Sequence, residues 1–116
     1  MDEYELNPNR YRELKHFCLQ YGDYKKELML LRATDGYLEK HYDPTSALAI
    51  RETELVNAIG LIETTASETE RFLSNRILKV ITEDMDLGRL TQPIARECMD
   101  AMRRRYYFLL HKKKGL

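Results

Sequence analysis

The sequence has few of the features that mark membrane proteins, secreted proteins or zinc proteins. It contains only two cysteines, Cys18 and Cys98, and neither belongs to a CxxC motif or lies near a pair of histidines. This spacing argues against a zinc site and a structural disulfide, so we expect two reduced, partly buried thiols. No apolar run approaches the roughly 18 to 20 residues of a membrane span. The opening residues MDEYELNPNR lack the apolar core of a signal peptide, so we expect a cytoplasmic location.

The sequence also lacks the short motifs of common enzyme classes. It contains no P-loop, HExxH, GxSxG or GxGxxG pattern, and its three histidines are scattered along the chain. The carboxylates Glu52, Glu54 and Glu63 fall in a segment rich in charges, where we interpret them as a solvated helix face. These observations favour a protein that is not an enzyme and has no cofactor, no metal site and no small-molecule substrate.

No segment alternates apolar and polar residues for long enough to predict a β-strand, whereas helix signals are frequent. Asn7-Pro8 is a helix cap followed by proline at the first helical position, and Tyr21-Gly22-Asp23 is predicted to end that helix and cap the next. The second helix is predicted to stop near Asp35-Gly36. Asp43-Pro44 repeats the cap signal and predicts a long helix to about residue 66. Ser67 and Glu70 form a capping box that predicts a fourth helix.

Apolar residues recur at helical spacing and predict the core. One face of each helix is expected to point inward. The predicted inner residues are Tyr11, Leu14, Cys18 and Tyr21, then Tyr24, Leu28 and Leu31, then Leu48, Leu55, Ile59, Ile62 and Ala66, and finally Leu73, Ile77, Val80 and Ile81. The aromatic residues near the N-terminus could stack on single-stranded nucleic acid, but their helical spacing and acidic surroundings favour core packing; they are Tyr4, Tyr11, Phe17, Tyr21 and Tyr24.

Charge is distributed unevenly along a chain whose formal net charge is zero. Residues 1–88 carry 11 Lys and Arg against 17 Asp and Glu, a net charge of −6, and residues 89–116 carry 8 against 2, a net charge of +6. Such asymmetry is typical of a surface for nucleic acid or for an acidic partner. Two alternatives stay open, namely a basic helix end that complements its own dipole and an acidic patch on a sister chain.

The basic region has the outline of a helix-turn-helix. A short helix over Asp86–Leu90 and a turn at Thr91-Gln92-Pro93 would precede a longer helix from about Ile94 to His111. We therefore predict one all-α domain over residues 1–116, a bundle of about five to six helices. Residues 1–83 would form the core and the oligomerisation region, and residues 84–116 the basic helix-turn-helix-like region.

The last helix is predicted to have an inner and an outer face. Apolar residues gather on the inner face, namely Ile94, Cys98, Ala101, Met102, Tyr106 and Leu109, with Met99 and Phe108 at its borders. Arg96, Asp100 and Arg103 are the candidates for base edges, because they lie nearest the helix start on the outer face. Phosphates would be met by Arg89, Arg104 and a flexible basic end made of Lys112, Lys113 and Lys114. Arg105 projects into the apolar face, where we expect a structural ion pair with Glu83 or Asp84.

Three blocks of the sequence resemble a family of small prophage-encoded proteins of Gram-positive bacteria. The blocks are NPNRYRELKHFCLQYGDYKKEL, DPTSALAIRETELVNAIGLIETTA and RRRYYFLLHKKK. The C-terminal halves of that family look distantly similar to RinA/ArpU-type phage transcription regulators, which carry a sigma region-4-like helix-turn-helix. The resemblance implies that Ile94 to Leu110 is the recognition helix and that the acidic N-terminal helices support oligomerisation. The sequence departs from the pattern before that helix, where Leu87-Gly88-Arg89-Leu90 and Thr91-Gln92-Pro93 stand in place of a longer helix and a glycine-containing turn.

Together these observations lead to two hypotheses of different classes. The first is a phage-derived, all-α DNA-binding protein that acts as a dimer on double-stranded DNA and regulates transcription. The second is a phage assembly or protein-interaction component whose basic end docks on an acidic surface, with a small terminase-like packaging subunit lying between the two.

Overall fold

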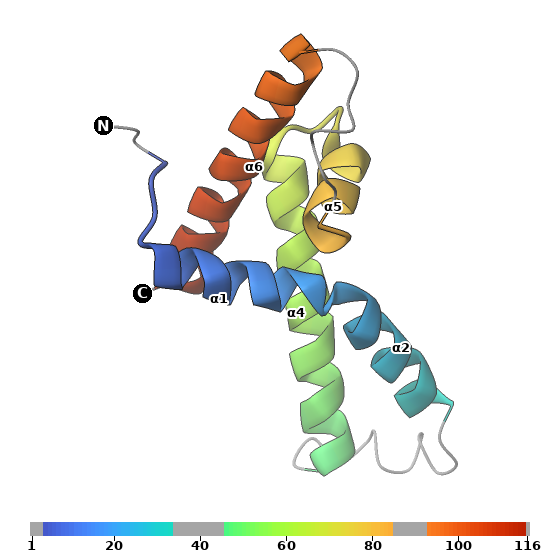
Figure 1. Cartoon of the computed structure of the whole chain (residues 1–116). Helices are drawn as coiled ribbons and strands as arrows, with labels where there is room; N and C mark the ends of the chain where they lie inside the picture. The colour runs from blue at the N-terminus through green and yellow to red at the C-terminus, as the bar shows by residue number, and fades with distance from the viewer. Residues whose placement is uncertain (1–3, 34–45, 85–92, 116) are drawn as a thin grey trace.

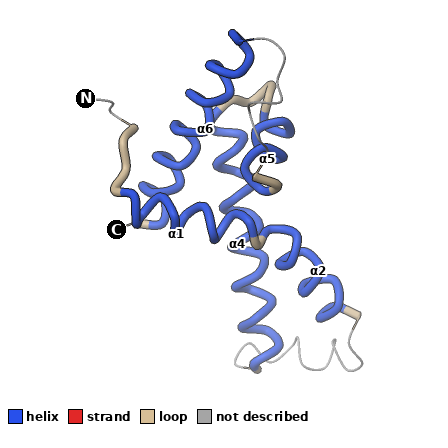
Figure 2. Tube along the Cα trace, in the orientation of Figure 1, coloured by secondary structure: helices blue, strands red, loops and turns tan. Residues whose placement is uncertain are grey.

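The computed structural model describes residues 4–33, 46–84 and 93–115. Within these ranges every regular element is an α-helix, as Figure 2 shows for the described part of the chain. The helices are α1 (Pro8–Leu19), α2 (Tyr21–Arg32), α4 (Ala47–Thr69), α5 (Ser74–Thr82) and α6 (Pro93–Lys114). None of these helices combines the length and the apolar character needed to cross a membrane. The prediction of an all-α helical bundle is confirmed.

The long helix α4 is the central element of the bundle. Its second half packs against α5 on one side and α6 on the other, and α2 packs along its first half (Figure 1). Helix α1 runs across the bundle and contacts both α5 and α6. The α2–α4 pair projects from the remaining helices, so the molecule is elongated, with a longest dimension of 53 Å.

One hydrophobic core draws side chains from all of these helices. Its buried members are Leu14, Cys18, Tyr21, Ile62, Ala66, Ile77, Ile81, Tyr106, Tyr107 and Leu110. The predicted inner faces of α1, α4 and α5 are confirmed by this set, to which Leu55 and Val80 add two further buried positions. The C-terminal half of α6 closes the core, because Tyr106 and Leu110 are completely buried.

The beginning of α1 follows the prediction, but its end does not. The Asn7 side chain accepts a hydrogen bond from the Asn9 amide at 2.8 Å, and Pro8 takes the first helical position. The helix ends at Leu19, and α2 begins directly after Gln20, so Tyr21-Gly22-Asp23 lies inside α2 instead of separating the two helices. Tyr21 is buried and its hydroxyl donates to Glu63 Oε2 at 2.9 Å, which holds the first turn of α2 against α4.

Helix α4 continues through the predicted capping box, which was therefore wrong. Ser67 lies within α4 and Glu70 follows its last residue, while α5 begins only at Ser74. The added turn is held by the core, because Thr65 and Thr69 are buried and their hydroxyls donate to backbone carbonyls four residues earlier. Burial of these two threonines with satisfied hydroxyls thus outweighs the local preference of Ser67 for a helix N-terminus.

Several predictions fall on parts of the chain outside the described residues. These are the Asp35-Gly36 stop, the Asp43-Pro44 cap, the short helix over Asp86–Leu90 and its turn, and the contact assigned to Arg89. In the described part, α4 begins with Ser46 as its cap, whose Oγ accepts a hydrogen bond from the Ala49 amide at 3.1 Å.

Candidate nucleic-acid interface

The C-terminal half of α6 is anchored in the core by two adjacent tyrosines. The Tyr106 hydroxyl donates to the Ile62 carbonyl at 3.1 Å and lies 3.5 Å from Cys18 Sγ. The Tyr107 ring packs edge-on against Tyr11, with ring centroids 4.9 Å apart. Aromatic pairs at this spacing contribute beyond the area they bury. This end of α6 is therefore joined to both α1 and α4.

Burial keeps these hydroxyl and thiol groups neutral. Desolvation raises the pKa of Tyr106 and of Tyr107 well above the ordinary value for tyrosine, and raises the pKa of the Cys18 thiol to about 11. For Tyr21, burial and the neighbouring Glu63 raise the pKa to about 12. A general acid or base works best with a pKa near the operating pH, so this cluster is structural in character.

The inner face of α6 is rotated from the predicted one. Met99, Tyr106, Tyr107 and Leu110 are buried, whereas Cys98 and Ala101 are exposed. The prediction of a partly buried Cys98 was wrong for the same reason. Five consecutive apolar residues, Tyr106 to Leu110, place an apolar side chain on every face of the helix, so periodicity alone cannot fix its rotation. The larger rings and Leu110 bury more apolar area than cysteine and alanine, and they determine which face turns inward.

Arg105 does not lie in the core, contrary to the prediction. Its side chain is exposed, and the described residues include no ion pair between it and Glu83 or Asp84. Asp84 instead pairs with Lys15 of α1 at 3.3 Å. The rotation of α6 thus adds Arg105 to the outward face.

The two arginines predicted to contact base edges, Arg96 and Arg103, differ in their exposure and in their ion pairs. Asp100 accepts a hydrogen bond from Arg103 Nη2 at 2.7 Å, and its other oxygen lies 3.4 Å from Arg104 Nε. Arg103 is partly buried, while Arg96 is exposed. Asp100 thereby neutralises part of the charge of its two neighbours and orients their guanidinium groups.

The basic end of α6 is not a flexible tail, so that prediction was wrong. The helix continues to Lys114, and each lysine contacts the chain's own surface. Lys112 lies over the Phe108 ring at 4.7 Å, Lys113 pairs with Glu68 of α4 at 2.9 Å, and Lys114 lies over the Phe17 ring at 3.8 Å. The contacts of Lys113 with α4 and of Lys114 with α1 fasten the helix end, whereas the contact of Lys112 lies within α6.

The N-terminal segment docks beside the same helix. Arg10 Nε donates to His111 Nδ1 at 2.9 Å, and the Tyr4 ring packs edge-on against Phe108 with centroids 5.2 Å apart. Phe17 and Tyr24 pack with each other at 5.9 Å. The prediction that the N-terminal aromatic residues serve packing is confirmed.

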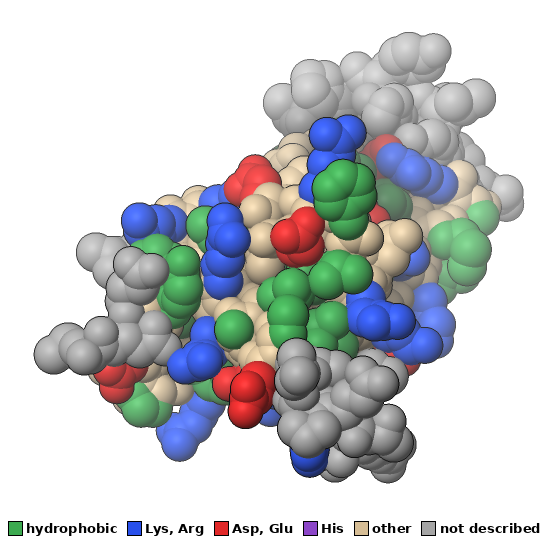
Figure 3. Space-filling model, turned by 90° about the horizontal axis from the view of Figure 1, so that it is seen from above, with side chains coloured by type: hydrophobic (Ala, Val, Ile, Leu, Met, Phe, Trp, Pro, Cys, Tyr) green, Lys and Arg blue, Asp and Glu red, His purple; other side chains and the backbone are tan. Residues whose placement is uncertain are grey.

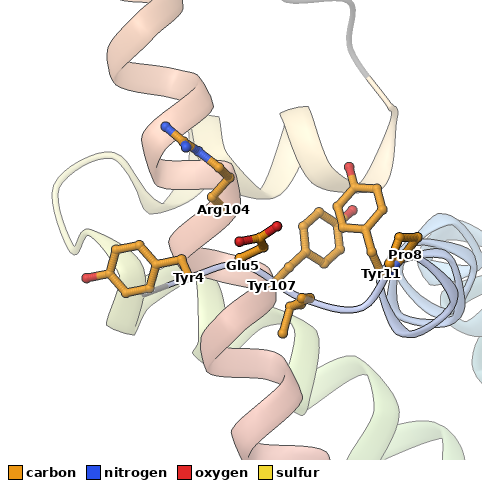
Figure 4. A pocket seen from close by; sticks show the side chains of 7 residues that line it. Tyr4, Glu5, Pro8, Tyr11, Arg104 and Tyr107 are labelled. Carbon is orange, nitrogen blue, oxygen red and sulfur yellow. The ribbon is translucent and has the colours of Figure 1, made fainter. Parts of the chain in front are cut away.

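A pocket of about 550 Å³ opens between this segment and α6. In Figure 4 the Glu5 side chain lies between Tyr4 and Tyr107, and Arg104 lies one turn before Tyr107 on α6. The remaining lining residues are Leu6, Pro8 and Tyr11. A carboxylate beside the only described cation of the lining opposes the binding of a phosphate there. The pocket lining therefore does not favour a phosphate-binding site inside the pocket.

The carboxylates of α4 were interpreted as a solvated face, which holds only in part. Glu52 is buried, with 7% of its surface exposed, and accepts hydrogen bonds from Arg32 of α2 at 3.1 and 3.2 Å. Glu54 pairs with Arg51 at 3.0 Å on the exposed side of the same helix. Both contacts are ion pairs within the fold.

A second cationic surface, which the sequence analysis missed, lies on α5 and the turn before it. Arg71, Arg76 and Lys79 are exposed, and in the described part of the chain their side chains form no ion pair or hydrogen bond. We call these three residues, with the exposed Phe72 and Asn75, the α5 cationic face. The sequence does contain a signal for it, since residues 71–82, RFLSNRILKVIT, hold three cations and no carboxylate.

The described residues contain no group of three or more His, Cys, Asp or Glu side chains arranged to hold a metal ion. Comparison with protein-family models, with curated proteins and with solved structures finds no match for the chain. The resemblance to prophage proteins therefore stays a prediction.

Proposed function

We propose that the protein binds double-stranded DNA through the outward face of α6. One observation carries the proposal: Arg104 and Arg105 are exposed on a helix whose other side is anchored in the core by Tyr106 and Leu110. Arg96 adds a further exposed cation near the start of the same helix. A helix held in this way presents its cations on a rigid support. Arginine suits the task because its planar fork donates two hydrogen bonds at once to a phosphate or to a guanine edge.

The surroundings of these arginines favour phosphate contacts over base reading. Glu97 is exposed on the same helix, and Asp100 partly neutralises Arg103 and Arg104. Binding that depends on phosphates is sensitive to salt and tolerant of sequence. We therefore expect modest sequence preference, with affinity falling steeply as salt is raised.

The test is fluorescence anisotropy with a labelled mixed-sequence duplex, titrated with the full chain at about 50 and 200 mM salt. We expect binding at the lower salt and a fall of at least about tenfold at the higher. The variant Arg96→Gln/Arg105→Gln should bind more weakly, because both side chains are exposed and neither forms an ion pair in the described structure. No binding by the wild-type chain at the lower salt would show the proposal to be wrong.

The more specific role that we propose is that of a phage-derived transcription regulator. The support is the resemblance of three sequence blocks to prophage-encoded proteins. A reporter fused to promoters of the surrounding operon, measured with and without the protein, tests this role. A packaging role would leave the reporter unchanged while DNA binding persists.

Exposed apolar side chains favour a second candidate, an assembly or protein-interaction component. Met29 of α2 is 64% exposed, and Ile50 and Val56 of α4 are 48% and 42% exposed. They lie on the projecting α2–α4 pair, away from the basic end of α6. Light scattering separates the candidates, because Met29→Ser/Ile50→Ser should dissociate an oligomer built on these residues. If these side chains do not form the contact between chains, the variant should have the same molar mass in solution as the wild-type chain.

A further inference from the structure

The turn between α4 and α5 presents an aromatic side chain to solvent. Phe72 is 92% exposed, the highest value among the large hydrophobic residues of the described chain. The turn is ordered locally, since the Phe72 amide donates to Glu70 Oε1 at 3.3 Å and Glu70 follows directly on α4. Phe72 contributes little to the core, so it is available to an external partner.

Cations accompany Phe72 along one side of α5. Positions 72, 75, 76 and 79 follow the helical period and face outward, while Ile77, Val80 and Ile81 face the core. Arg71 stands next to Phe72 in the turn. Figure 3 views this end of the molecule from above, where Lys and Arg side chains border exposed hydrophobic ones, with a few acidic side chains among them.

These charges differ from those at the end of α6. Lys113 pairs with Glu68 and Lys114 lies over Phe17, whereas Arg71, Arg76 and Lys79 make no such contact within the described chain. Their charge is therefore available to an anionic partner. The first turn of α5 has no side-chain cap, and the positive end of the helix dipole adds to the same potential.

We propose that the α5 cationic face is a DNA-contacting surface, on which Phe72 inserts at a base step while Arg71, Arg76 and Lys79 contact phosphates. An exposed aromatic ring beside unpaired cations suits a polyanion that also offers flat apolar rings. Apolar wedges flanked by basic residues use this combination in duplex DNA. An acidic protein would satisfy the cations but would not require the ring.

This inference rests on the proposed function and assigns it a second contact surface. The α4–α5 turn and the beginning of α6 lie at the same end of the molecule (Figure 1). Arg96, near the start of α6, and the α5 cationic face can therefore both approach one duplex. The basic end of α6 lies at the other end of that helix, next to α1.

The experiment compares two variants of the full chain that lose the same charge. Arg71→Gln/Arg76→Gln/Lys79→Gln changes the α5 cationic face, and Lys112→Gln/Lys113→Gln/Lys114→Gln changes the basic end of α6. Binding to a labelled mixed-sequence duplex is followed by anisotropy from about 50 to 200 mM salt. We expect the α5 variant to lose at least about tenfold in affinity, with the salt slope falling by about 2 to 3. The α6 variant should change affinity by less than about threefold.

Phe72→Ala tests the ring separately. It should weaken duplex binding by about tenfold while leaving the salt slope unchanged, because stacking is not an ionic contact. Leu30→Ala is the matched control, since it removes another exposed apolar side chain, on α2 and not on α5. Circular dichroism should give all four variants the helix content of the wild-type chain, because every replaced side chain is largely outside the core.

Each result decides between alternatives. Unchanged duplex binding by the α5 variant, or an equal loss in both charge variants, overturns the inference and leaves the proposed function standing. No duplex binding by the wild-type chain overturns both. Vesicles of phosphatidylserine and phosphatidylcholine complete the comparison, because Phe72-dependent vesicle binding without duplex binding would assign the face to a lipid surface instead.

Discussion

The basic end of α6 and the α5 cationic face use positive charge in opposite ways. At the end of α6 three consecutive lysines are fastened to Phe108, Glu68 and Phe17. On α5 three cations spread over nine residues remain unpaired in the described structure. The region with the higher charge density in the sequence is thus the one with less charge available to a partner. A binding surface is therefore indicated by cations that lack a partner within the described fold, and not by the number of cations in a segment.

This difference comes from where the two helices bury their apolar residues. Tyr106, Tyr107 and Leu110 place the last turns of α6 against α1 and α4, so the flanking lysines reach aromatic rings and carboxylates of those helices. Helix α5 is short and buries one face only, so its opposite face points to solvent. Substitutions in each region test this difference.

Truncating Tyr106 should have the largest effect on stability. Tyr106→Ala removes a completely buried ring and leaves a cavity among α1, α4 and α6, which should lower the free energy of unfolding by about 3–5 kcal/mol. Tyr106→Phe keeps the ring but loses the hydrogen bond to the Ile62 carbonyl, which should lower the free energy of unfolding by about 1 kcal/mol. Urea denaturation measures both. A small effect of Tyr106→Ala would mean that the end of α6 is not anchored.

The two thiols should differ strongly in reactivity. Cys98 is exposed on α6, whereas Cys18 is buried against Tyr106 and burial raises its pKa to about 11. Reaction of Cys18 requires opening of the core, so Cys98 should react with a maleimide at least about 100-fold faster. Mass spectrometry after timed labelling of the wild-type chain and of Cys98→Ser gives the two rates. Similar rates would contradict the burial of Cys18.

Removing one lysine of the basic end should have a small effect on stability. Lys113→Gln breaks the pair with Glu68, which is partly exposed, so the loss should be below about 1 kcal/mol. A double-mutant cycle with Glu68→Gln isolates the pair. Arg76→Gln on α5 is the matched control and should leave the unfolding free energy within about 0.5 kcal/mol, because Arg76 has no ion pair to lose among the described residues. If the coupling energy between Lys113 and Glu68 is zero, the cations of α6 stabilise the fold no more than those of α5.

The ion pair between Arg51 and Glu27 lies away from both regions and should have the smallest effect on the free energy of unfolding. That effect should be visible only in its pH dependence. Hydrogen bonds from Arg51 lower the pKa of Glu27 below its usual 4.5. Because the folded-state pKa is lower than the unfolded-state pKa, the stabilisation is present above pH 4.5 and is lost as the pH falls through the folded-state pKa. The stability difference between wild type and Glu27→Gln, measured by urea denaturation, should narrow below that pH. A constant difference would contradict the assignment.

The helices were predictable where local signals and tertiary packing agree. Asn7-Pro8 begins α1 as expected, and Leu55, Ile62 and Ala66 turn inward on α4. The signals failed where packing decides. The capping box at Ser67 was overridden by burial of Thr69, and the rotation of α6 was set by the bulk of its adjacent tyrosines. Arg105 turned outward with that rotation.

The candidate site was less predictable than the fold for the same reason. Exposure of Arg96 agrees with the prediction, but the contacts of Lys113 and Lys114 lie with residues about 45 and 97 positions earlier in the chain. Such pairings depend on the helix arrangement, which periodicity does not provide. Phe72 showed no signal in the sequence, because an exposed phenylalanine cannot be told from a buried one by residue type alone.

The position of Tyr106 in the chain also bears on the order of folding. Its bond to the Ile62 carbonyl and its contact with Cys18 span 44 and 88 residues. During synthesis the earlier helices emerge first, and their apolar faces remain without the cover that α6 supplies. Long-range closure of this kind slows folding and leaves apolar surface open to other chains. Nascent chains should therefore become resistant to proteases in one late step, when the tyrosine pair leaves the ribosome.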